Sequence, residues 1–139
     1  MIIIKKNTIT VQSYLAIRKC VGWRKLLTSQ AEQALQHSLY VVGAYDGEKL
    51  VGMGRIVGDG AVICYVQDLI VIPEYQCQGV GSMVLHSLIE YVESLRTEGA
   101  QMMLCLMCAK GRETFYEKHG FIARPTEELG PGMIQYLRD

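Results

Sequence analysis

The sequence predicts one α/β domain of the α+β type, in which helices cover both faces of a mixed, mostly antiparallel sheet. Three observations lead to this. Residues 39–72 are rich in strand-forming residues and contain two turn signals, one long amphipathic helix follows them, and a short apolar run comes after that helix. This order gives hairpin-linked strands and then a parallel crossover. With 139 residues, half of them apolar, the chain suits a single domain over 1–139.

The N-terminal part is expected to form one strand and two helices. The strand is "MIIIKK" at residues 1–6, and the helices span residues 10–20 and 29–38. Ser29 and Glu32 have the spacing of a capping box, which predicts that Ser29 caps the second helix.

The central part is expected to form three antiparallel strands joined by hairpins. They span residues 39–45, 49–57 and 61–72. Asp46-Gly47 and Asp59-Gly60 are typical of the tight turns between such strands. Pro73 ends the third strand because proline has no backbone N–H to donate.

The C-terminal part begins with the strongest helix of the sequence, over residues 79–97, whose apolar side chains recur at the helical period. A buried strand over 101–108, a short helix over 111–120 and two short strands near 121–124 and 132–138 complete the chain. The whole order predicts about seven strands and about four helices.

The loop "PEYQCQGVGS", from Pro73 to Ser82, is the segment most indicative of function. It places Gly79 and Gly81 between a strand and the start of a helix, where unpaired N–H groups and the helix dipole attract anions. Glycines let such amides come close to a phosphate. The glycines also fit a helix start at which they only relieve crowding.

Two common phosphate-binding motifs do not match this loop. No Lys-Ser or Lys-Thr pair follows the glycines, as a P-loop requires, and Val84 stands where the dinucleotide motif has its third glycine. A nucleotide-dependent oxidoreductase is therefore disfavoured.

The loop, together with a second segment, resembles the GNAT superfamily of N-acetyltransferases. Gln76 to Gly81 matches the Q/R-x-x-G-x-G/A loop that binds acyl-CoA in that family, and "FYEKHGF", from Phe115 to Phe121, is similar to its F-Y-x-K-x-G-F segment. The order of elements fits this fold over nearly the whole chain. Ala109 and Arg112 depart from the Asn and Ala that many members carry, which puts in doubt the cofactor contact of that Asn.

The resemblance implies that acetyl-CoA is the co-substrate and that main-chain groups bind it. Amides of the loop hold the pyrophosphate, and the strand at 68–72 lends backbone groups to the pantetheine arm, as an added strand would pair. The residues implied in cofactor binding are Leu69, Ile70, Val71, Gln76, Cys77, Gln78, Gly79, Val80, Gly81 and Ser82.

Two side chains are candidates for catalysis of amine acetylation. Asp68 lies within the apolar run "VQDLIVI" and is a candidate base for the attacking amine; the alternative is a structural carboxylate that binds an arginine such as Arg55. The resemblance assigns to Tyr116 the protonation of the leaving thiolate, for which a phenol is a suitable acid. A tyrosine packed under its helix is the alternative.

The sequence gives less information about the acceptor. A small-molecule primary amine is expected, and the pattern around Asp68 resembles that of small arylalkylamine acetyltransferases, which implies an aromatic amine. Trp23 is a candidate wall of the acceptor pocket. A protein amine as acceptor, and an acyl-CoA sensor without catalysis, are the alternatives.

Composition narrows the remaining functional classes. Charges balance at 14 against 14 and form no long basic run, which argues against a nucleic-acid partner, and no apolar stretch is long enough to span a membrane. The five scattered cysteines favour the reducing cytoplasm, and no zinc site is expected because Cys105 and Cys108 lack a second pair. A homodimer through the C-terminal strands is a further expectation.

Overall fold

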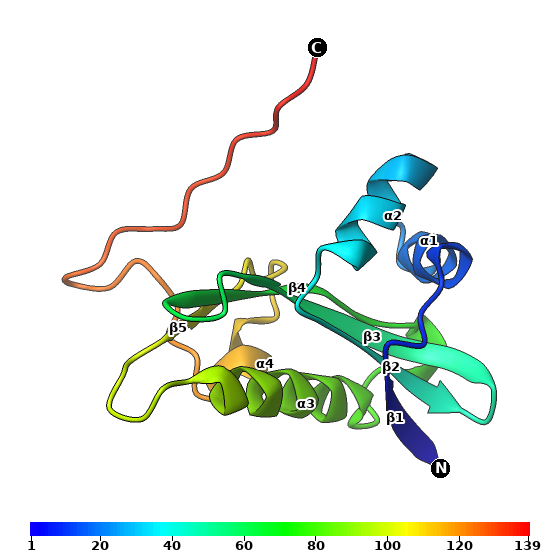
Figure 1. Cartoon of the computed structure of the whole chain (residues 1–139), viewed down its shortest axis with the longest axis horizontal. Helices are drawn as coiled ribbons and strands as arrows, with labels where there is room; N and C mark the ends of the chain where they lie inside the picture. Colours follow the sequence, from blue (N-terminus) through cyan, green and yellow to red (C-terminus); the bar gives the residue numbers. More distant parts are fainter. The chain divides into compact units, whose positions relative to one another are not determined.

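The computed structural model describes all 139 residues (Figure 1). The chain forms two compact units, Met1–Cys105 and Leu106–Asp139, which are described in turn. No helix in either unit is both long enough and apolar enough to cross a membrane.

The first unit contains a five-stranded sheet in the order β1-β2-β3-β4-β5. Its strands are β1 (Ile2–Lys6), β2 (Tyr40–Asp46), β3 (Lys49–Gly58), β4 (Ile63–Val71) and β5 (Met103–Cys105). Neighbouring strands are antiparallel up to β4, and β5 pairs with β4 in parallel. The predicted hairpins and the parallel crossover are confirmed, but the count of about seven strands is wrong.

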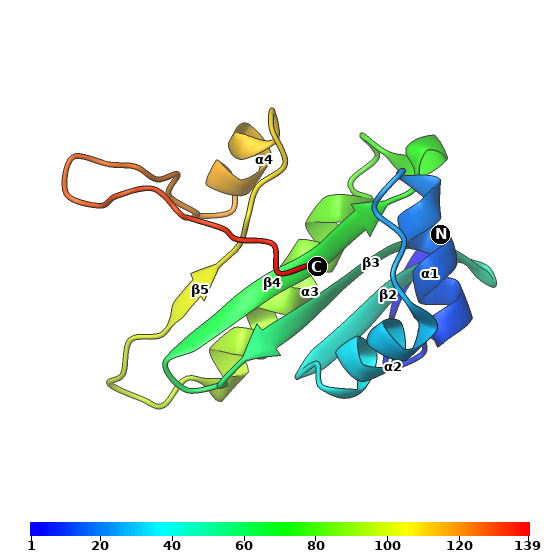
Figure 2. The same ribbon diagram turned by 90° about the horizontal axis from the view of Figure 1, so that it is seen from above.

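Helices cover both faces of this sheet, as expected (Figures 1 and 2). Helices α1 (Val11–Cys20) and α2 (Thr28–Gln36) lie on one face, and α3 (Val80–Leu95) lies on the other. Thr10 caps α1 by accepting a hydrogen bond from the backbone N–H of Ser13, at 3.1 Å. Helix α2 begins one residue before the predicted cap Ser29, and Gln30 Oε1 accepts from the Leu27 N–H at 3.3 Å.

Two glycines in β3 allow α3 to pack closely on the sheet. A Cβ atom at Gly54 would lie 2.7 Å from Leu88 Cδ1 and 3.0 Å from Val84 Cγ1, and one at Gly52 would lie 3.0 Å from Val80 Cγ1. The α3 side chains are thus seated against bare backbone, which fixes the N-terminal end of α3 beside the middle of the sheet.

Strand β4 contains a β-bulge at Asp68. Gln67 pairs with Arg55 and Ile70 with Met53, so Asp68 and Leu69 together lie opposite the single residue Gly54. Asp68 has a left-handed backbone, with φ of 53°, which is uncommon for a residue other than glycine.

Strand β5 is shorter than the run predicted over 101–108. Its parallel pairing with β4 covers only Ile63–Tyr65 opposite Met103–Cys105. Residues 107–110, after β5, are outside any strand and are exposed, Cys108 included.

The second unit contains one short helix and a long irregular segment. Helix α4 (Glu113–Glu117) is shorter than the predicted range 111–120, and Gly120 follows it with φ of 92°. The strands predicted near 121–124 and 132–138 do not form. Pro125 and Pro131 donate no backbone hydrogen bond, and residues 122–139 are all exposed, so neither range has the buried face that stabilises a strand.

Candidate functional site

The glycine loop connects β4 to α3 through a short 3₁₀ turn, η1 (Pro73–Tyr75). Two glutamine side chains hold its backbone in place. Gln76 Nε2 donates to the carbonyl of Val71 and Gln78 Nε2 to the carbonyl of Glu74, each at 2.9 Å. The glutamines that lead into the glycines therefore close the loop on itself, which leaves its main chain available for a ligand.

The backbone of the loop turns sharply at two residues. Cys77 has φ of 61° and Gly79 has φ of 86°, both in the left-handed region. Left-handed residues in a turn let successive N–H groups point the same way, an arrangement that binds anions. Glycine suits position 79 because a side chain there would strain the backbone, although no atom lies within 4 Å of its Cβ position.

Helix α3 begins directly after this turn. Gly79 is its N-cap, and no side chain caps the helix. The N–H groups of Val80, Gly81 and Ser82 have no intrahelical acceptor, because the first backbone bond of the helix runs from Met83 N–H to the Gly79 carbonyl at 3.1 Å. These amides and the positive end of the helix dipole together favour an anionic ligand.

The β2–β3 hairpin supports the loop from outside. Tyr75 Oη donates to Asp46 Oδ2 at 2.5 Å, and the Lys49 ammonium lies 5.5 Å from the centre of the Tyr75 ring. The hydrogen bond to Asp46 is the main reason that the pKa of Tyr75 is raised, because ionisation would remove the donated proton.

The edge of β4 that faces away from β3 provides a second main-chain surface. Because β5 pairs only with Ile63–Tyr65, no strand pairs with this edge over Leu69, Ile70 and Val71. Val71 and Ile70 pair with β3 on their other edge, and Leu69 lies in the bulge. The predicted cofactor-binding residues therefore lie on one continuous stretch of backbone, from the bulge of β4 to the first turn of α3.

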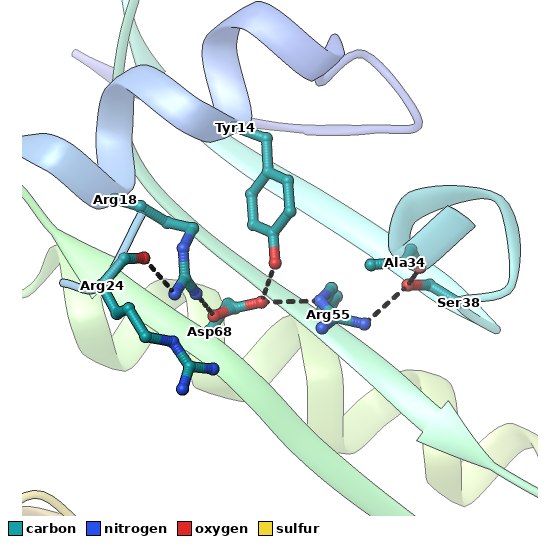
Figure 3. Close-up of polar contacts among 7 residues, drawn as sticks. All are labelled: Tyr14, Arg18, Arg24, Ala34, Ser38, Arg55 and Asp68. Atoms are coloured by element: carbon teal, nitrogen blue, oxygen red, sulfur yellow. Dashed lines mark hydrogen bonds and ion pairs between the residues drawn. The ribbon is translucent and has the colours of Figure 1, made fainter. Parts of the chain in front are cut away.

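Asp68, the predicted catalytic residue of this unit, lies in a buried ionic cluster with Tyr14, Arg18 and Arg55 (Figure 3). Arg18 Nη1 donates to Asp68 Oδ1 at 2.6 Å, and Arg55 Nε donates to Oδ2 at 2.7 Å. Tyr14 Oη also donates to Oδ2. Asp68 pairs with Arg55, as the structural interpretation of this carboxylate predicted. Both carboxylate oxygens accept hydrogen bonds, which favours a structural role for Asp68 over that of a free base.

Burial of this ionic cluster changes the ionisation of Tyr14. The pKa of Tyr14 is raised, first by burial and then by the hydrogen bond that it donates to Asp68. Tyr14 therefore stays a neutral donor to the carboxylate across the physiological pH range.

Further contacts join the ionic cluster to α2 and to the segment between α1 and α2. Arg55 Nη1 donates to Ser38 Oγ at 3.2 Å, and Ser38 Oγ donates to the Ala34 carbonyl at 2.7 Å (Figure 3). Arg18 Nη2 donates to the Arg24 carbonyl at 3.0 Å, while its buried Nε has no partner. Trp23, the predicted acceptor wall, is 40% exposed and its ring lies 5.4 Å from the Arg18 guanidinium carbon.

An open pocket of about 400 Å³ adjoins the ionic cluster on the α2 side. Four of its lining residues come from α2 and its C-terminal end and two from β3: Gln30, Gln33, Ala34, His37, Arg55 and Val57. Arg55 belongs to both features, because its guanidinium contacts Asp68 and also lines the pocket.

Tyr116 belongs to the second unit, on α4. Its ring packs edge-on against Phe115 and Phe121, with centroids 5.0 and 5.9 Å apart. Burial is the main cause of its raised pKa, to which the neighbouring Cys108 adds. Its hydroxyl makes no hydrogen bond within the chain and stays protonated at neutral pH, as an acid requires.

Sequence reasoning found the glycine loop, Asp68 and Tyr116 but missed Tyr14, Arg18 and the pocket. The sequence did indicate that Tyr14 and Arg18 act together, because they are one helical turn apart and share a face of α1. Nothing in the sequence connects them to Asp68, from which they are 54 and 50 residues distant. The structure contains no group of three or more His, Cys, Asp or Glu residues that could hold a metal ion.

Comparison with known proteins gives a consistent result. Residues 36–123 match the family model described as "Acetyltransferase (GNAT) domain". The chain is 28% identical over 138 residues to the uncharacterized N-acetyltransferase ycf52 of Porphyra purpurea, covering 95% of this chain and 76% of that protein.

Solved structures are similar over the full length. A GNAT-family acetyltransferase from Streptococcus pneumoniae is 35% identical with a TM-score of 0.83, and all of both chains is covered. A Staphylococcus aureus protein of unknown function is 31% identical with a TM-score of 0.85, covering 98% of this chain and 100% of that one.

Proposed function

The chain belongs to the GNAT family of acetyltransferases, and from that premise we propose that it transfers an acetyl group from acetyl-CoA to the primary amine of a small molecule. The observation that carries the proposal is the main-chain surface that runs from the bulge of β4 into the first turn of α3. It matches the chemistry of a coenzyme with a pyrophosphate at one end and an amide-containing arm at the other.

We assign the two parts of the coenzyme to the two parts of this surface. The pyrophosphate binds the amides from Gln78 to Ser82, where the helix dipole and several N–H groups replace a lysine. The pantetheine arm lies along Leu69, Ile70 and Val71, whose outer edge lacks a strand partner. An N–H near Leu69 or Ile70 polarises the thioester carbonyl, because the bulge removes this part of β4 from regular pairing.

Transfer takes place directly between coenzyme and acceptor in a ternary complex. The amine nitrogen forms the new C–N bond and gives its proton to solvent water, the C–S bond breaks, and the thiolate leaves. Tyr116 donates its phenolic proton to that thiolate and recovers one from water. An acyl-enzyme on Cys64 or Cys105 is disfavoured, because burial raises the pKa of each thiol and keeps it protonated.

The hydrogen bonds of Asp68 bear on whether it acts as the base in this reaction. To act as the base, one of its oxygens would have to exchange a donor, Tyr14, Arg18 or Arg55, for the amine. We therefore propose that Asp68 holds the bulge in place, and we retain direct proton transfer to Asp68 as the competing role.

Three further proposals concern the whole molecule. The family match spans both compact units, which supports one domain over 1–139. All five cysteines are free, in agreement with a reducing cytoplasm. Exposed Met133, Ile134 and Leu137 support a homodimer through the C-terminal segment, a state that analytical ultracentrifugation would measure.

The test of the proposed function is release of coenzyme A from acetyl-CoA with pools of small amines, polyamines and peptides. The wild type and Tyr116→Phe run in parallel, with a protein-only blank because the free cysteines react with thiol reagents. We expect release with a small-amine pool and a loss of about 10²-fold in kcat in Tyr116→Phe with acetyl-CoA affinity unchanged.

Other outcomes decide between the alternatives. Unchanged kcat in Tyr116→Phe would refute the acid role. Release only with peptides would indicate a protein amine, and tight acetyl-CoA binding without release from any pool would indicate a sensor.

A further inference from the structure

We infer that the pocket between α2 and β3 binds an oxyanion, a carboxylate or a phosphate, carried by the acceptor amine. This inference rests on the proposed function, because it specifies the acceptor of that reaction. It depends on four observations: the charge of the ionic cluster, the unused donors of the pocket, the basic layer of α1 and α2, and the link that Arg55 makes between the pocket and Asp68.

The ionic cluster has more positive than negative charge. Arg18 and Arg55 both pair with the single carboxylate of Asp68, and each has a side chain that is only 11% exposed. Arginine remains protonated in proteins, so one positive charge of the pair is not neutralised. A charge held away from water is unfavourable unless it is paired, and an anion beside the cluster would pair it.

Arg55 extends this excess charge to the pocket. Its Nε donates to Asp68 and its Nη1 to Ser38, while its Nη2 makes no hydrogen bond. Since Arg55 lines the pocket, the unused Nη2 is the donor available to a ligand there. A guanidinium is well suited to bind a carboxylate or phosphate oxygen.

The other polar residues of the pocket also suit an anion. Gln30 uses its side-chain oxygen to accept from the Leu27 N–H, so its amide N–H groups are the ones left for a ligand. Gln33 and His37 each bring a side chain able to donate, and no aspartate or glutamate lines the pocket. A cationic group in this pocket would be repelled by Arg55 and would find no carboxylate with which to form an ion pair.

The N-terminal layer that covers this face is basic, although the whole chain is neutral. The segment that carries α1 and α2, residues 7–38, contains four lysines and arginines and one acidic residue, whereas residues 39–139 contain eight basic and thirteen acidic residues. Charge of one sign around a pocket attracts ligands of the opposite sign and raises their rate of association.

The position of the pocket relates the oxyanion to the reaction. The same Arg55 guanidinium reaches Asp68 at 2.7 Å, and Asp68 lies in the bulge beside the proposed thioester site. An acceptor with its oxyanion on Arg55 would therefore place its amine within a short distance of the acetyl group. The volume of about 400 Å³ suits a small molecule.

The test measures binding and does not depend on turnover. Calorimetry in the presence of coenzyme A compares two pairs of amines, O-phosphoethanolamine with ethanolamine and β-alanine with n-propylamine. Gln33→Glu places a carboxylate in the pocket at an exposed position, and Gln36→Glu makes the same charge change on the same helix outside the lining.

We expect the wild type to bind one or both anionic amines at least about tenfold more tightly than their neutral partners. Gln33→Glu should weaken that binding about three- to tenfold, and Gln36→Glu should leave it within about twofold. The phosphate and carboxylate pairs distinguish which oxyanion is preferred.

Two outcomes overturn the inference: equal binding within both pairs, or equal weakening in both variants. Tighter binding of tryptamine than of either anionic amine would also overturn it, in favour of an aromatic acceptor. Failure of the proposed function looks different. In that case the anionic amines bind, and Gln33→Glu weakens them, but no amine is acetylated.

Discussion

The two faces of the sheet are built in different ways. On the α3 face, apolar side chains of the helix, among them Val80, Val84 and Leu88, are fully buried against β3 and its bare glycines. On the α1 and α2 face, the central contact is the ionic cluster of Tyr14, Arg18, Arg55 and Asp68 (Figure 3). In the proposed function, the loop at the start of α3 presents backbone to the coenzyme, and the opposite face presents side chains to the acceptor.

The difference explains what each face can recognise. Backbone amides are the same whatever the sequence, so a coenzyme shared by a whole family is well served by a loop of fixed shape. An acceptor that varies between family members has to be recognised by side chains, which change without altering the loop. The four predictions that follow test this contrast, from the largest effect to the smallest.

Removal of the central carboxylate should have the largest effect. Asp68→Ala leaves Arg18 and Arg55 without their shared partner, and we expect it to lower the free energy of unfolding by about 3–5 kcal/mol. Urea denaturation measures this, with Glu48→Ala, which removes an exposed carboxylate from a turn, as the control. Equal midpoints for the two variants would show that the ionic cluster contributes little to folding.

Crowding of the opposite face should cost less. The Cβ atom of Gly54→Ala falls 2.7 Å from Leu88 Cδ1, so α3 must shift or its side chains must repack, at about 1–3 kcal/mol. Gly130→Ala, where nothing lies within 4 Å, is the matched control. The same denaturation experiment applies, and an effect no larger than that of Gly130→Ala would mean that α3 is not closely seated.

Strain in the glycine loop should separate stability from coenzyme binding. Gly79→Ala and Gly22→Ala both force a left-handed residue to carry a side chain in open space, so each should lose about 1–2 kcal/mol of stability. Only Gly79→Ala should also weaken coenzyme A binding, by about tenfold, because Gly79 lies in the loop whose amides form the proposed anion site. Calorimetry that gave both variants the same affinity would contradict the assignment of the loop.

The smallest effect is a pH dependence on the α1 side. The folded pKa of Tyr14 is raised above its usual value of 10, so the stability that its neutral phenol contributes is present below pH 10 and is lost as pH rises further. The difference in unfolding free energy between wild type and Tyr14→Phe should therefore shrink above pH 10. Tyr75→Phe, whose partner Asp46 is partly exposed, should show a weaker change. A difference that stays constant through pH 11 would contradict this account.

The two faces also differed in how far the sequence predicted them. The α3 face could be predicted because its sequence signals are local. They are the apolar helical period of α3, the closely spaced Gly79 and Gly81 before it, and Pro73 at the end of β4. The ionic cluster could be predicted only in part. Asp68 was conspicuous within its apolar run, but only the tertiary fold brings it to Tyr14 and Arg18.

The prediction of two C-terminal strands was wrong for a related reason. The ranges 121–124 and 132–138 have apolar residues such as Phe121, Ile122 and Ile134, which favour strands locally. A strand also needs a partner and a covered face, and neither requirement can be read from the residues themselves. Ile122 and Ile134 remain 77% and 64% exposed.

The early end of β5 has a consequence for the protein before it meets its coenzyme. From Val66 onward, one edge of β4 has main-chain N–H and C=O groups without a neighbouring strand. Such an edge invites pairing with another chain and is a known route to aggregation. The bulge and the left-handed Asp68 interrupt its regular spacing, which is a natural defence against that pairing. The interruption that shapes the proposed thioester site therefore also hinders strand pairing between another chain and this edge of β4, and a ligand lying along β4 would block the edge completely.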